Sequence, residues 1–177
     1  MRILNLGCGE TKITGAVNVD VNPSTGCDLT FDIKKPFPLE DKSFDKVCLF
    51  HCIEHIEKNF HFPVFKEIHR VLIDGGTLLL AYPEFSEILQ NWLNNALCDR
   101  EFWEATIYGR QKYPGDYHYC GIHTPNLIEE LRGIGFKIER HGPEPSQTFN
   151  TMMVCTKGEP LPTYEEVLYK EILARNT

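Results

Sequence analysis

The sequence has no pair of cysteines in C-x-x-C spacing, and its seven cysteines follow no repeating interval. An odd number without a pattern fits neither a disulfide framework nor a zinc knuckle, because both depend on fixed spacings. Several of the cysteines stand inside apolar runs, where a thiol acts as a small hydrophobic side chain. We therefore expect reduced cysteines and a reducing compartment.

The chain also lacks an apolar run of the ~20 residues that a membrane-spanning helix requires. Its first apolar stretch is interrupted at once by Asn5, Gly7 and Gly9, and so does not resemble a secretory signal peptide. From these absences we expect a cytoplasmic protein that has no membrane partner.

An excess of positive charge is missing as well. The 177 residues include 18 Lys and Arg against 25 Asp and Glu, which gives a formal net charge of -7. Affinity for nucleic acids comes mostly from clustered basic side chains that displace counterions. We therefore expect a small-molecule substrate and no nucleic-acid partner, while the sequence leaves the oligomeric state open.

What the sequence does contain is an alternation of strand-like and helix-like segments. Its length suits one domain with a single core, and the alternation predicts a parallel sheet with helices on both faces. Apolar runs predict strands at 2–6, 16–21, 29–33, 44–50, 77–82, 135–140 and 151–156. Helical spacing covers 52–72, where the helix proper is expected to begin at Pro63. Further helices are predicted irregularly over 83–117, over 124–132, and in a short segment after the capping box at 163–166.

Glycines and polar residues follow the predicted strands. In open α/β sheets the ligand binds beyond the carboxyl ends of the strands. Glycine lets the backbone approach a ligand closely, and an acid after the second strand accepts hydrogen bonds from ribose hydroxyls, each worth about 1.5–3 kcal/mol. An acid after the third strand would accept the adenine amine, with the next backbone unit near the ring. The residues at these positions are Gly7, Gly9, Asp20, Asp32, Ile33, His51 and Pro83.

Four short motifs fall between residues 3 and 83. They are L-N-L-G-C-G at 4–9, P-F-P-x-x-D-x-S-F-D at 36–45, H-C-I-E-H-I at 51–56, and E-I-H-R-V-L followed by D-G-G within 67–76. Together they resemble the class I S-adenosylmethionine-dependent methyltransferases of the type 11 branch. The later Y-G at 108–109 and D-Y-H at 116–118 are similar to a compact bacterial and phage subgroup of that branch.

The resemblance implies a fold and a cofactor. The implied fold is α/β, a three-layer Rossmann-like sandwich with a mostly parallel seven-stranded sheet whose last strand is antiparallel. It implies a single domain over residues 1–160, in which 84–120 form a substrate lid, and a helical tail over 161–177. The cofactor would be S-adenosylmethionine, with S-adenosylhomocysteine as the product. The implied cofactor-binding residues are Asn5, where the family usually has an acid, and Gly7, Cys8, Gly9, Asp20, Val21, Asp32, Ile33, Phe50 and His51.

The reaction would need a base if the methyl acceptor is a hydroxyl. Histidine suits this role because its unperturbed pKa of about 6.5 lies near working pH. The candidates are His51, His118 and His123, whereas His55 and His69 fall within the predicted helix and are expected to pack there. The subgroup resemblance favours a small polar acceptor and O-methylation of a sugar or glycan precursor.

Three alternatives stay open. His51-x-x-Glu54-His55 matches the H-x-x-E-H motif of zinc proteases, but no third ligand is evident, and we expect no metal. A nicotinamide-dependent oxidoreductase also uses a glycine turn, although position 12 is Lys where that fingerprint needs glycine. The third is a protein that binds the adenosyl cofactor without catalysis.

Overall fold

A computed structural model describes residues 1–94, 100–113, 115–145 and 147–159. Cys98 and the predicted tail helix lie outside the described residues. Within these ranges, no helix has the length and apolar character needed to span a membrane.

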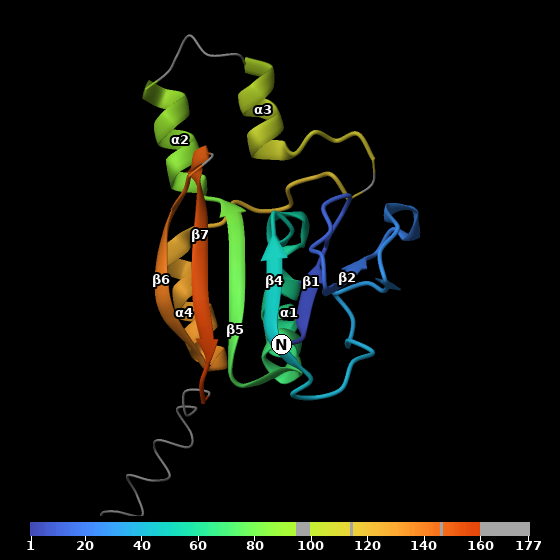
Figure 1. The fold of residues 1–177 in the computed structure, drawn as a ribbon. Coiled ribbons are helices and arrows are strands. Elements are labelled where there is room, and N and C mark those ends of the chain that lie inside the picture. Colours follow the sequence, from blue (N-terminus) through green and yellow to red (C-terminus); the bar gives the residue numbers. More distant parts are fainter. Residues whose placement is uncertain (95–99, 114, 146, 160–177) are drawn as a thin grey trace, which may run out of the picture.

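The described residues form a seven-stranded sheet in the order β3-β2-β1-β4-β5-β7-β6 (Figure 1). Neighbouring strands from β3 to β5 are parallel, whereas β7 is antiparallel to both β5 and β6. The Rossmann-like sheet with an antiparallel last strand is therefore confirmed. The strands are β1 Ile3–Leu6, β2 Ala16–Asp20, β3 Leu29–Thr30, β4 Phe44–Phe50, β5 Leu72–Pro83, β6 Phe136–Glu144 and β7 Gln147–Lys157.

Strand register brings the ends of β1, β2 and β4 to one edge. Leu6 lies opposite Val19 on one side and Leu49 on the other. The residues that follow these three positions in the chain therefore lie side by side. From β1 the chain continues to β2 and β3 on one side, whereas β4 and the later strands lie on the other side. Such a point, where the strand order reverses, is the usual ligand site of an open α/β sheet.

The helices α1 (Lys58–Val71) and α4 (Thr124–Ile134) contact each other and lie against the same face of the sheet (Figure 1). This face is apolar, with Leu4, Val47 and Leu78 adjacent in register and fully buried. The next register row on the opposite face includes Lys46 and Thr77. A helical layer on that second face is not among the described residues, because the connections after β1 and β2 are short and hold only the three-residue turn η1 (Pro23–Thr25).

Two helices stand above the carboxyl ends of β4 and β5. They are α2 (Phe85–Asn94) and α3 (Arg100–Tyr108), and both fall in the segment expected to form a lid (Figure 1). Buried Glu84 fixes the base of this segment, because its carboxylate accepts hydrogen bonds from the backbone N–H groups of Ser86 and Thr124. One carboxylate thus ties the first turns of α2 and α4 together.

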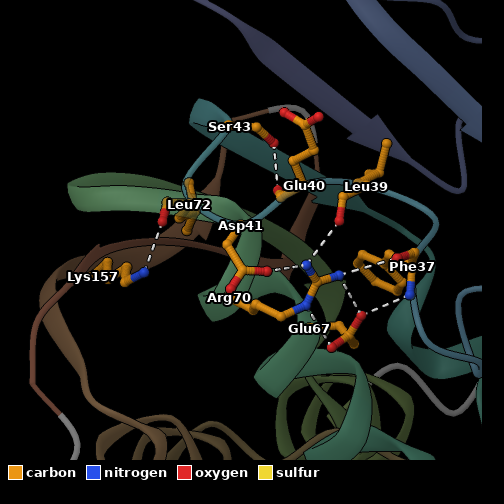
Figure 2. A network of polar contacts seen from close by, with 9 residues as sticks. All are labelled: Phe37, Leu39, Glu40, Asp41, Ser43, Glu67, Arg70, Leu72 and Lys157. Atoms are coloured by element: carbon orange, nitrogen blue, oxygen red, sulfur yellow. Dashed lines mark hydrogen bonds and ion pairs between the residues drawn. The ribbon is translucent and has the colours of Figure 1, made fainter.

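The family motifs at 36–45 and 67–72 meet at the opposite end of the molecule (Figure 2). The Arg70 guanidinium donates to the carbonyls of Phe37 and Leu39 and to the carboxylates of Asp41 and Glu67. Glu67 in turn accepts a hydrogen bond of 2.6 Å from the Phe37 N–H. These residues hold the loop before β4 against α1, so this part of the motif is structural.

Candidate active site

The glycine loop after β1 has the shape of a ligand cradle. Gly7 and Gly9 have φ angles of 62° and 49°, in the left-handed region that favours glycine. A Cβ on Gly7 would collide with the Sγ atom of Cys52, whereas a Cβ on Gly9 would meet no atom within 4 Å. Gly7 is thus required by protein packing, and Gly9 borders open space where a ligand can approach.

Asp20 at the end of β2 lies directly against this loop. One carboxylate oxygen accepts the Gly9 N–H at 2.8 Å and the other accepts the Asn22 N–H at 2.9 Å. An ionised carboxylate has about four acceptor sites, so two remain for the hydroxyls of a ribose. The half-buried Asp20 and the open space beside Gly9 therefore fit an adenosyl group.

The other expected cofactor residues lie at the same edge of the sheet, with different exposure. Cys8 is buried and continues the glycine loop, Val21 is exposed beside Asp20, and Phe50 ends β4. Asp32 accepts a hydrogen bond of 3.0 Å from the Lys34 N–H, ahead of buried Ile33.

Asn5 differs from the expectation because its side chain is used inside the protein. Its Nδ2 group donates to Asn18 Oδ1 at 3.0 Å and to the Thr11 carbonyl at 3.3 Å, and the residue is buried. Asn5 therefore stabilises the glycine loop from within the protein. Lys12 also stabilises this loop, since its ammonium donates to the carbonyls of Gly9 and Thr25.

A cavity of about 420 Å³ lies beyond the ends of β4 and β5 and under α3. This is the size range of small-molecule sites. Most of its polar lining groups accept hydrogen bonds, and Arg110 is a basic side chain among them. The lining includes His51, Glu54, His55, Asp116, His118, Glu144 and Asn150, with Pro83, Phe102 and Phe149 as apolar walls.

His51 has an unusual backbone in this cavity. It follows β4 directly, and its φ of 47° is rare for a residue with a side chain and costs conformational energy. Its ring lies between two carboxyl groups, with Nδ1 at 3.9 Å from Glu54 and Nε2 at 3.4 Å from Glu144. The left-handed backbone therefore places an exposed imidazole at the cavity wall, next to the two carboxyl groups.

His118 also lines the cavity, but in a different state. Its Nδ1 donates to the Thr106 carbonyl at 3.0 Å, and its ring is edge-on to His55 with centroids 4.8 Å apart. Burial, with a smaller contribution from His55, lowers the pKa of His118 to about 4. His118 is therefore neutral at physiological pH.

Glu54 lines the same cavity as these two histidines. Burial raises the pKa of its carboxyl to about 8, and the residue is only 2% exposed. The sequence predicted residues 52–72 as helical, but Ile53–His55 form the short 3-10 turn η2 and α1 begins at Lys58. The H-x-x-E-H interpretation fails here because no helical face presents His51 and His55 together.

His55 and His123 also differ from the expectation. His55 does not pack within a helix but lines the cavity, whereas His69 does lie in α1 and contacts the Gly158 carbonyl. His123 precedes α4 as an exposed residue and does not line the cavity. The catalytic role considered for His123 therefore gains no support from its position and stays a prediction.

Comparison with known proteins agrees with this geometry. A methyltransferase-domain family model of type 11 matches residues 4–80. A methyltransferase structure from Methanosarcina mazei aligns with a TM-score of 0.66 at 16% identity, covering 88% of this chain and 92% of the other. A methyltransferase structure from Archaeoglobus fulgidus has a TM-score of 0.64 at 13% identity, covering 88% of this chain and 86% of the other. One from Mesorhizobium loti has a TM-score of 0.61 at 16% identity, covering 88% of this chain and 90% of the other. Among curated proteins, none matches the sequence.

The fold and the glycine loop are similar to those of class I S-adenosylmethionine-dependent methyltransferases. The methyltransferase-domain match covers residues 4–80, and this match together with the fold implies S-adenosylmethionine as the cofactor. The oxidoreductase alternative fails because an antiparallel β7 lies between β5 and β6, unlike the parallel dinucleotide-binding sheet.

Proposed function

We propose that this methyltransferase methylates a hydroxyl of a small polar acceptor, such as a sugar or glycan precursor, and that His51 accepts the hydroxyl proton. The observation that supports this most is the acceptor-rich lining of the cavity, with the carboxyl groups of Glu54, Asp116 and Glu144 and the imidazoles of His51 and His118. Such a lining suits a ligand with many hydroxyl donors and disfavours an anionic one.

Asp20 and the glycine loop would hold the adenosyl part of the cofactor, and the bound cofactor supplies an electrophilic methyl group. The cavity then has to hold the acceptor hydroxyl in line with that group, at about 3–3.5 Å. Pro83, Phe102 and Phe149 supply apolar walls to this cavity.

His51 is the group that we assign as the base. Its imidazole accepts the hydroxyl proton, and the Glu144 carboxylate at 3.4 Å stabilises the imidazolium that forms. Glu54 contributes less to this stabilisation, because its raised pKa keeps it protonated near neutral pH. His118 lines the same cavity as a neutral imidazole.

The test is a methylation assay of the purified full chain with monosaccharides and other uncharged glycosides, and with carboxylate and amine compounds as comparison acceptors. Products are identified by mass spectrometry, and S-adenosylhomocysteine is measured as the coproduct. We expect methylated hydroxyl products, lost in His51→Asn and kept in His141→Asn, which changes an exposed histidine of β6. Asparagine tolerates the left-handed backbone at position 51, so the first variant should fold. Methylation confined to carboxylates or amines would contradict the proposal.

A further inference from the structure

Three side chains on the cavity wall converge in a way that methyl transfer alone does not explain. Glu54 and His55 come from η2, and His118 comes from the segment after α3. One ligand-type atom from each of the three lies within 4.8 Å of those from the other two. Two imidazoles and a carboxylate at this separation are a common ligand set for metal ions.

Hydrogen bonds fix the protonation of both rings. His55 Nδ1 lies 3.0 Å from the Tyr117 carbonyl, and His118 Nδ1 lies 3.0 Å from the Thr106 carbonyl. A carbonyl oxygen only accepts, so each Nδ1 carries the hydrogen and each Nε2 of the neutral ring keeps a lone pair. Metal-binding histidines are oriented in this same manner, by donation of the other ring N–H to a backbone carbonyl.

Glu54 supplies the second, independent observation. The residue is 2% exposed, and its Oε2 atom has no hydrogen-bond partner among the described residues. A buried carboxyl oxygen without a partner is destabilising, because a polar group that leaves water and finds no hydrogen bond loses its hydration uncompensated. The described residues therefore leave a buried carboxyl oxygen of Glu54 without a donor, in a residue whose ligand-type atom lies within 4.8 Å of those of His55 and His118.

We propose that Glu54, His55 and His118 bind one divalent first-row transition-metal ion, with Zn²⁺ as the natural candidate. A set of two nitrogens and one oxygen suits such ions, whereas Mg²⁺ and Ca²⁺ prefer oxygen ligands alone. Three protein ligands leave at least one coordination position open, and the site faces the cavity. This assignment replaces the expectation from sequence that no metal is bound.

The function of the ion, unlike its binding, rests on the proposed function of the cavity. An acceptor hydroxyl at the open position would lose its proton more readily, because a bound divalent cation lowers the pKa of its oxygen ligands. His51 is not among the three ligands and stays available as the base. The ion would therefore orient and activate the hydroxyl that His51 deprotonates.

The experiment uses the full chain without a polyhistidine tag, stripped of metal by a chelator. Zn²⁺ alone is titrated by calorimetry, and Co²⁺ alone is followed by the visible absorption of its nitrogen-coordinated form. His55→Ala, His118→Ala and Glu54→Gln are compared with His141→Ala as the matched control, with circular dichroism to verify folding. No cofactor or acceptor is present, so metal binding is measured separately from methyl transfer.

We expect one equivalent of metal to bind to the wild-type chain and to His141→Ala. Affinity should fall by roughly tenfold or more in His55→Ala and His118→Ala. Absence of saturable metal binding to the wild-type chain would overturn the proposal, and this outcome does not depend on the folding of any variant. A folded His118→Ala variant that binds the metal with the affinity of the wild type would overturn it as well. A chain that binds the ion but methylates nothing contradicts the proposed function and supports the metal site.

Discussion

The carboxylate of Asp20 accepts a hydrogen bond of 2.8 Å from the backbone N–H of Gly9. This contact joins the end of β2 to the glycine loop after β1, across the point where the strand order of the sheet reverses. An acid at this position both shapes the loop and keeps acceptor sites for a ligand. The cofactor site is thus built from two adjacent strand ends.

Asp20→Ala should weaken the binding of S-adenosylhomocysteine by at least about tenfold. The variant removes a charged acceptor, and such a hydrogen bond contributes about 1.5–3 kcal/mol. Calorimetric titration measures the affinity directly. Glu129→Gln removes an exposed acid on α4 and should leave it unchanged. Equal affinities of Asp20→Ala and the wild type would remove Asp20 from the cofactor site.

Gly7→Ala and Gly9→Ala should have different effects. Both place a Cβ at positive φ, which costs about 1–2 kcal/mol of stability. Gly7→Ala adds a collision with Cys52 and should destabilise the protein further, whereas Gly9→Ala fills open space and should mainly weaken cofactor binding. Urea denaturation and calorimetry separate the two effects.

A second substitution controls this comparison. Cys52→Gly removes both Cys52 atoms that the new Cβ of Gly7→Ala would meet. The double variant should therefore recover part of the stability lost in Gly7→Ala. Additive losses in the double variant would mean that the collision is not the cause.

Arg70→Met should lower the free energy of unfolding by about 2–3 kcal/mol, because the guanidinium holds two carboxylates and two carbonyls of the loop before β4 (Figure 2). The network lies at the opposite end of the sheet from the cofactor site, so the affinity for S-adenosylhomocysteine should not change. Arg132→Met, at an exposed position of α4, is the matched control. A selective loss of cofactor affinity without loss of stability would contradict the structural role.

Stability should fall as the pH drops below about 6.5, the ordinary histidine pKa. His61 is fully buried in α1, and burial lowers its pKa in the folded protein. Its stabilising contribution is present above the unfolded pKa and is lost as the pH falls toward the folded one, by up to about 1.4 kcal/mol per pH unit. His61→Gln should show a shallower decline in chemical denaturation between pH 7 and 5. An unchanged slope would exclude His61 as a contributor.

The sequence predicted most of the sheet because its signals are local. The apolar residues within Phe44–Phe50 become a strand in which Phe44, Val47, Cys48 and Leu49 are buried, and the predicted and observed bounds of β4 agree. The start of α1 was predicted five residues too late, since Pro63 indicated a first turn. The helix begins at Lys58 and includes Pro63 because His61, Val64 and Phe65 extend the buried face.

The cavity was predicted less completely because its residues are far apart in the chain. Asp20, Gly7 and Gly9 are identified by their place after a strand, which spacing reveals. The convergence of Glu54 with His118, or of His51 with Glu144, depends on how η2, the lid and β6 pack together. No local pattern marks the positive φ of His51 either, because histidine adopts that region without a glycine to signal it.

A crystal structure of the chain with bound S-adenosylhomocysteine tests the central claim most directly. The account predicts that the ribose hydroxyls contact the Asp20 carboxylate and that the cofactor sulfur lies beside His51 at the mouth of the cavity. A cofactor bound away from Asp20, or with its sulfur directed away from His51 and the cavity, would contradict it.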